Sequence, residues 1–143
     1  MATEPNLTLV FAAVLSALAA LLHLGIIVGG APWYRFFGAG KRMSAAAASG
    51  RRYPSLITAT IALILLAWSA YALSGAGVLG MLPLRKAVLL AITGVYLARG
   101  LVPVPLLWFA RSQVSPFWVW SSLICLVFGA VHLAGVVQAW ARL

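Results

Sequence analysis

Residues 7–28 read LTLVFAAVLSALAALLHLGIIV, a predominantly apolar run that contains one histidine and is free of Asp, Glu, Lys and Arg. A helix that crosses the roughly 30 Å hydrocarbon core of a bilayer needs about 20 such residues. A cleaved signal peptide would place Lys or Arg before a shorter apolar run, whereas residues 1–6 contain Glu4 and no basic residue. The run therefore predicts a retained transmembrane helix, ending near the breakers Gly29, Gly30 and Pro32.

Three more apolar stretches of similar length follow, at residues 56–78, 86–109 and 117–139. The second of these three is irregular, because Arg99 lies near its middle and Gly100, Pro103 and Pro105 come directly afterwards. A proline lacks the backbone N–H and clashes with the carbonyl four residues back. We therefore expect this helix to be broken.

The composition places the chain in lipid and removes several kinds of chemistry. Of the 143 residues, 64% are hydrophobic and 8% charged, against about 25% charged residues in soluble proteins. The sequence thus predicts an all-α four-helix transmembrane bundle, a single integral membrane domain over residues 1–143. Glu4 is the only acidic side chain and Cys125 the only cysteine, so we expect no metal, no cofactor and no paired-carboxylate catalysis. A membrane enzyme that uses His and Tyr for proton transfer is a third alternative, after ligand binding and an accessory role in a membrane complex.

Basic residues are unevenly distributed between the two sides of the predicted bundle. One side carries six: Arg35, Lys41, Arg42, Arg51, Arg52 and Arg111. The other side carries three: Arg85, Lys86 and Arg142. The positive-inside rule then predicts a multi-pass protein of the bacterial inner membrane with both termini outside.

The basic first loop predicts contact with membrane lipid rather than nucleic acid. Its opening, Pro-Trp-Tyr-Arg-Phe-Phe at residues 32–37, is aromatic, and residues 41–49 predict a short interfacial helix. Five cations are candidates for binding anionic headgroups: Arg35, Lys41, Arg42, Arg51 and Arg52. Simple anchoring of an ordinary positive-inside loop is the alternative.

Polar residues within the spans predict two layers. Thr93, Tyr96 and Arg99 recur every three residues and so share a side of one helix, and His23 lies at a similar depth. These four are the candidate ligand-binding residues, unless Arg99 snorkels to the interface from a helix that ends at Gly100.

Tyr71 and His132 form the second predicted layer. His23 and His132 are separated in depth by roughly 14 Å, at 1.5 Å per residue, so one haem iron cannot bind both. The alternative for each histidine is a neutral side chain that only bonds to a carbonyl or hydroxyl group.

Small residues recur at four-residue spacing in the first and fourth spans. The sets are Ala12, Ser16 and Ala20; Gly25 and Gly29; and Ser121, Cys125 and Gly129. Such residues let helix backbones approach closely. The helices that approach can belong to this chain, to a second copy in a homo-oligomer, or to a membrane-protein partner.

Three segments carry a resemblance to a known family: PWYRFFGAG at 32–40, YALSGAG at 71–77 and RGL at 99–101. Across most of its length the chain resembles small uncharacterised four-helix inner-membrane proteins of Gram-negative bacteria. That family often has an acidic residue after the first segment, where this chain has Lys41. The resemblance implies the fold and the location and supplies no activity or site residues.

The function that the sequence favours is binding, with or without transport, of a lipid-like or small anionic ligand in a polar cavity around Arg99, Tyr96 and His23. The alternative is a structural or accessory subunit of a larger membrane complex.

Overall fold

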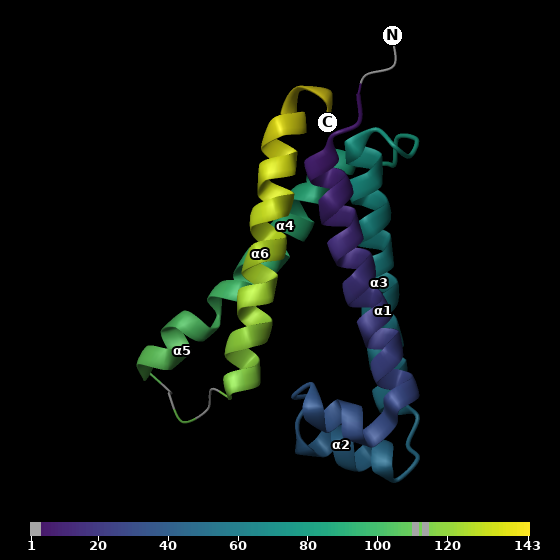
Figure 1. The fold of residues 1–143 in the computed structure, drawn as a ribbon, viewed down its shortest axis with the longest axis vertical. Helices are drawn as coiled ribbons and strands as arrows, with labels where there is room; N and C mark the ends of the chain where they lie inside the picture. Colours follow the sequence, from purple (N-terminus) through teal and green to yellow (C-terminus); the bar gives the residue numbers. More distant parts are fainter. Residues whose placement is uncertain (1–3, 110–111, 113–114) are drawn as a thin grey trace. The chain divides into compact units, whose positions relative to one another are not determined.

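The computed structural model describes residues 4–109, 112 and 115–143, and the regular structure in them is helical (Figure 1). The α-helices are α1 (Leu7–Phe36), α2 (Lys41–Ala48), α3 (Tyr53–Ala76), α4 (Arg85–Leu101), α5 (Pro103–Phe109) and α6 (Pro116–Ala139), and the 3-10 helix η2 (Trp140–Arg142) follows α6. Four helical stretches are long and apolar enough to cross a membrane: Leu7–Phe36, Tyr53–Ala76, Arg85–Pro105 and Pro116–Arg142. The all-α class with four candidate transmembrane helices is therefore confirmed, and the chain is a multi-pass membrane protein.

These helices form two compact units. The terminal unit consists of Met1–Ser16 and Trp68–Leu143, and the central unit of Ala17–Ala67. The terminal unit thus contains the start of α1, the end of α3 and all of α4 to α6, whereas the central unit contains the remainder of α1, α2 and the start of α3.

The predicted break in the third span lies between α4 and α5. The N–H of Val102 still donates to the carbonyl of Ala98 at 3.1 Å, but α4 ends at Leu101 and α5 begins at Pro103, which has no N–H to continue the ladder. Because of this break, the position of Arg99 within its helix differs from the prediction. We predicted it near the middle of a helix over residues 86–109, and the structure places it in the last turn of α4.

Helix α1 consists of two helical segments that meet at a kink at Gly30. Gly30 has φ 62° and ψ −150°, a conformation that is open essentially to glycine alone. Pro32 then lies in the first turn of the segment that follows, where a missing N–H costs little. The break predicted at Gly29, Gly30 and Pro32 therefore lies at Gly30, and a second helical segment continues from it to Phe36.

The kink folds the indole of Trp33 back onto the preceding turns. A Cβ atom added at Gly29 would overlap the Cγ atom of Trp33, and one added at Gly25 would lie 3.4 Å from the indole. We expected these two glycines to let helix backbones approach each other. In the structure they accommodate a side chain from their own helix.

The central unit also orders the first loop. The predicted helix over residues 41–49 is present as α2, in which Ser44 and Ala46 are buried and Lys41 and Arg42 are exposed. Between α1 and α3, the hydroxyl oxygens of Tyr34 and Thr58 are 3.0 Å apart. Thr58 donates to the carbonyl of Pro54, so Tyr34 is the donor to Thr58.

In the terminal unit, α4 and α6 are in close contact at two glycines. A Cβ atom at Gly100 would lie 2.9 Å from the amide nitrogen of Leu126, and one at Gly129 would lie 3.1 Å from that of Leu97. Each helix therefore presents a glycine to a leucine of its neighbour. This seam between α4 and α6 sets the positions of the side chains discussed below.

Asn6 connects three helices of the terminal unit at their ends. Its side-chain oxygen accepts from the N–H of Leu9 at 2.8 Å and caps α1. Its side-chain nitrogen donates to Gln138 on α6, and its backbone N–H donates to the carbonyl of Ala76 at the end of α3. Asn6 is 7% exposed. Because its amide is buried away from water, these bonds to protein groups satisfy its donors and acceptors.

Candidate functional site

Arg99 reaches from the last turn of α4 to the first turns of α6. Its Nη1 atom donates to the hydroxyl of Ser122 at 2.6 Å, and its Nη2 atom donates to the hydroxyl of Ser121 at 3.1 Å. The guanidinium carbon lies 5.8 Å from the ring centroid of Trp118. The half-buried guanidinium is therefore held by three residues from one helix.

The partners of Arg99 satisfy hydrogen bonds without neutralising charge. Ser121 donates its own proton to the carbonyl of Trp118, which leaves its oxygen to accept from Arg99. Both hydroxyls are neutral, and the only acidic side chain in the sequence is Glu4. Neither contact therefore supplies a counter-charge for the guanidinium.

Tyr96 lies one turn before Arg99, at the junction of four helices. Its hydroxyl is 3.0 Å from the hydroxyl oxygen of Ser16 on α1. Its ring makes edge contacts with Trp68 on α3 at 5.0 Å and with Phe128 on α6 at 5.4 Å between ring centroids. Tyr96 is 5% exposed, so it is part of the core of the terminal unit.

His132 contacts the same tyrosine. The two ring centroids are 5.1 Å apart, although we expected His132 to lie with Tyr71 in a separate layer. The prediction placed the two layers roughly 14 Å apart in depth at His23 and His132, so the direct contact between Tyr96 and His132 corrects the assignment of these two residues to separate layers. The structure thus joins Tyr96 and His132 in one cluster.

The imidazole of His132 has one satisfied and one unsatisfied nitrogen. Nδ1 lies 2.8 Å from the carbonyl oxygen of Phe128; since a carbonyl can only accept, Nδ1 carries the proton. Nε2 is buried and has no hydrogen-bond partner among the residues that the structure describes. Its lone pair therefore points into the protein interior.

The other predicted polar residues bond locally. The hydroxyl of Thr93 donates to Leu89 of its own helix at 2.8 Å. His23 belongs to the central unit, where its Nδ1 atom lies 2.7 Å from the carbonyl oxygen of Ala19. Tyr71 donates to the carbonyl of Pro83 in the loop between α3 and α4.

The candidate headgroup cations gather on the central unit. Every one of them is exposed: Arg35, Lys41, Arg42, Arg51 and Arg52. Arg111, which also entered the orientation argument, lies outside the described residues. The central unit contains no Asp or Glu at all, so its five exposed cations lack an acidic partner within the unit.

The partners of Arg99 were not identified from the sequence, although a signal for them was present. Ser121 was considered only as a small residue, and Ser122 was not singled out. Both lie early in α6, and α4 and α6 run in opposite directions, so the start of α6 meets the end of α4 where Arg99 lies.

Searches of protein-family models, of curated proteins and of solved structures returned no match to this chain.

Proposed function

We propose that this multi-pass protein resides in the bacterial inner membrane and binds a lipid-like or small anionic ligand beside Arg99. The excess of Lys and Arg in the first loop supports an orientation with both termini outside. Under that orientation, Arg99 lies toward the cytoplasmic leaflet, in which anionic lipids attract basic groups.

A single observation carries the proposal: the guanidinium of Arg99 is fixed by two neutral hydroxyls. Arg99 lies within the candidate span Arg85–Pro105, and charged residues inside transmembrane segments are rare and usually mark a functional path or a ligand. The hydroxyls of Ser121 and Ser122 hold two of the five guanidinium donors. The remaining donors suit a phosphate or carboxylate, which arginine binds in a planar, bidentate manner.

The test compares Arg99→Leu and Arg99→Lys with the unaltered protein. Phosphatidylglycerol bound to each protein is counted by native mass spectrometry, and phosphatidylcholine serves as the uncharged comparison. Loss of a charge-assisted pair of hydrogen bonds corresponds to about a hundredfold weaker binding or more, so Arg99→Leu should lose one bound lipid. Arg99→Lys should bind with intermediate strength, because lysine keeps the charge and lacks the planar fork.

Ser122→Ala is the matched control, since it removes a neutral partner and retains the cation. It should keep the bound lipid with a smaller loss of affinity. Equal lipid counts in all four proteins would contradict the proposal. Recovery of a stoichiometric membrane-protein partner without bound lipid would instead favour an accessory subunit.

A further inference from the structure

The two histidines of the chain make the same local bond in different surroundings. In each, Nδ1 lies close to the carbonyl oxygen four residues earlier, at 2.7 Å from Ala19 for His23 and at 2.8 Å from Phe128 for His132. The ring of His23 is half-buried in the central unit, whereas His132 is 0% exposed in the terminal unit. The two imidazoles are therefore bonded alike through Nδ1 and differ in burial.

A second proton on His132 would find no acceptor in the packed terminal unit. Because Nδ1 already donates its proton to Phe128, the second proton must bind at Nε2, which is buried without a partner among the described residues. The neighbouring ring of Tyr96 is tilted by 39° to the imidazole. An aromatic face attracts a cation, but it does not replace the acceptor or the water that a buried charge requires. The packed unit therefore accommodates the neutral form of His132.

Titratable side chains on the helices around His132 supply no counter-charge. Helix α4 contributes Tyr96, which contacts the imidazole, and α3 contributes Tyr71, which donates to a carbonyl of the following loop. Helix α6 itself contributes Cys125, two turns before His132. The part of α1 in the terminal unit, residues 7–16, has no titratable side chain. Phenols and thiols are uncharged at and below pH 7, so none of these groups can pair with an imidazolium.

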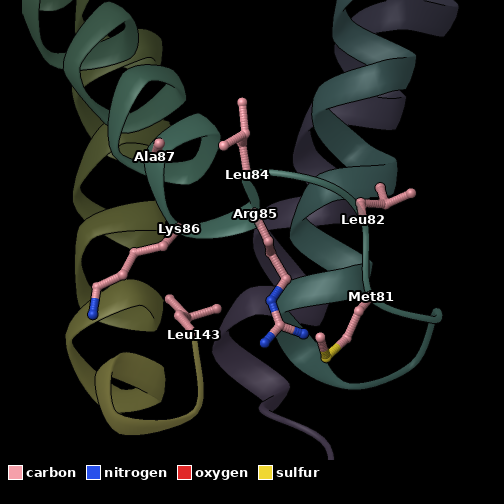
Figure 2. Close-up of a pocket in the computed structure, with 7 residues that line it drawn as sticks. All are labelled: Met81, Leu82, Leu84, Arg85, Lys86, Ala87 and Leu143. Atoms are coloured by element: carbon pink, nitrogen blue, oxygen red, sulfur yellow. The ribbon is translucent and has the colours of Figure 1, made fainter.

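The described cations of the terminal unit have other partners. Arg99 donates to hydroxyls at the start of α6, and at least ten residues, about 15 Å of helix, separate these from His132. Arg85, Lys86 and Arg142 each donate to a backbone carbonyl. Figure 2 shows the first two of these side chains pointing apart at the start of α4. The charge state of His132 therefore depends on its burial rather than on a neighbouring charge.

Tyr96 connects His132 to the other helices of the terminal unit. Its hydroxyl bonds to that of Ser16 on α1. Its ring contacts Trp68 on α3 and Phe128 on α6. The imidazole is part of the same cluster, so a His132 side chain that turns away from Tyr96 removes a contact on which the packing of four helices depends.

We propose that His132 is a proton-binding site that controls the packing of the terminal unit. The neutral ring packs against Tyr96 and keeps the helices together, and a proton taken up at Nε2 is retained only when α6 moves and the ring reaches solvent. Proton uptake thus accompanies opening, because the packed form has no acceptor for the added N–H group. The inference does not depend on the ligand proposed for Arg99.

The orientation proposed above indicates where this proton comes from. His132 lies seven residues before the end of α6, about 10 Å along the helix. With both termini outside, this end of α6 faces the outer side of the membrane. Acid on the outer side would therefore open the terminal unit.

The composition makes a test of this proposal selective. Histidine is the side chain that ordinarily titrates between pH 5 and 8, and the sequence contains two. Hydrogen–deuterium exchange of the full-length protein in detergent is measured from pH 7.5 to 5 and corrected for the intrinsic exchange rate. If opening binds one proton, protection in α4 and α6 should fall about tenfold per pH unit below about pH 6.5. Protection of residues 55–66, in the central unit, should not change.

Two matched variants assign the effect to one histidine. His132→Gln should remove the pH dependence, because glutamine can donate to the carbonyl of Phe128 and does not titrate. His23→Gln removes the other histidine and should keep the full pH dependence. In the unaltered protein, NMR of the imidazole nitrogens should show His132 gaining a proton together with a change in the ring resonances of Tyr96, a measurement that needs no variant to fold.

Three results would overturn the proposal. The first is protection in α4 and α6 that does not change with pH, or that still falls with pH in His132→Gln. The second is an equal loss of protection in both units, which would mean that acid unfolds the whole chain. The third is proton uptake by His132 while the Tyr96 ring resonances stay unchanged, since the packed form would then accommodate the imidazolium.

Discussion

Glycines serve different purposes in the two units of this protein. In the terminal unit, Gly100 and Gly129 bring the backbones of α4 and α6 together. In the central unit, Gly25 and Gly29 receive the indole of Trp33 from beyond a kink in the same helix. A four-residue spacing of small residues therefore predicts that another group packs closely against the helix. The surrounding structure determines whether that group is the backbone of a neighbouring helix or a side chain of the same helix.

The largest expected effect in this comparison is that of Gly100→Ala. The added Cβ atom would lie 2.5 Å from the Cγ atom of Leu126 and 2.9 Å from its amide nitrogen, so the two backbones must separate. Overpacking of this kind costs about 1–3 kcal/mol, and we expect the upper part of that range. Thermal unfolding in detergent measures the loss. An unchanged melting temperature would mean that the seam tolerates a wider spacing.

A smaller loss, of about 1–2 kcal/mol on the same overpacking scale, is expected for Gly29→Ala. The obstructing group is the Trp33 side chain, which can rotate away, whereas a backbone cannot. Hydrogen exchange should accelerate over residues 25–37 and remain unchanged in α4 and α6. Faster exchange in both units would show that the kink supports more than the central unit.

Gly94→Ala should have the smallest effect and the opposite sign. No atom lies within 4 Å of a Cβ atom at Gly94, and alanine favours a helix over glycine by about 1 kcal/mol. The melting temperature should therefore rise slightly. A fall would reveal a neighbour at this face of α4, such as a second protein chain.

The four spans and the break in the third could be predicted from the sequence, because hydropathy and proline act locally. The break at Gly30 was predicted as well, but the helical segment that follows it to Phe36 was not, since Gly29, Gly30 and Pro32 are compatible with either an end or a kink. The choice depends on the backbone angles of Gly30 and on the space that Trp33 finds.

The candidate site was predicted only in part. Spacing within α4 placed Tyr96 and Arg99 on one side of the helix, but spacing within one helix does not say which helix faces it. The pairing of Arg99 with Ser121 and Ser122, and the contact between Tyr96 and His132, follow from the register of α4 against α6. That register is set by Gly100 and Gly129; the sequence marks Gly129 as one of a series of small residues, but not which helix it faces.

The bonds of Asn6 have a consequence for the order of assembly during synthesis. Asn6 is made 132 residues before its partner Gln138. The central unit is a continuous segment and can form once residue 67 has been made. At about 5–20 residues per second, roughly 4 to 14 s pass between that point and the appearance of Gln138. During this interval the start of α1 lacks its α6 neighbours, so the nascent chain must keep an incomplete terminal unit in the membrane until translation reaches α6.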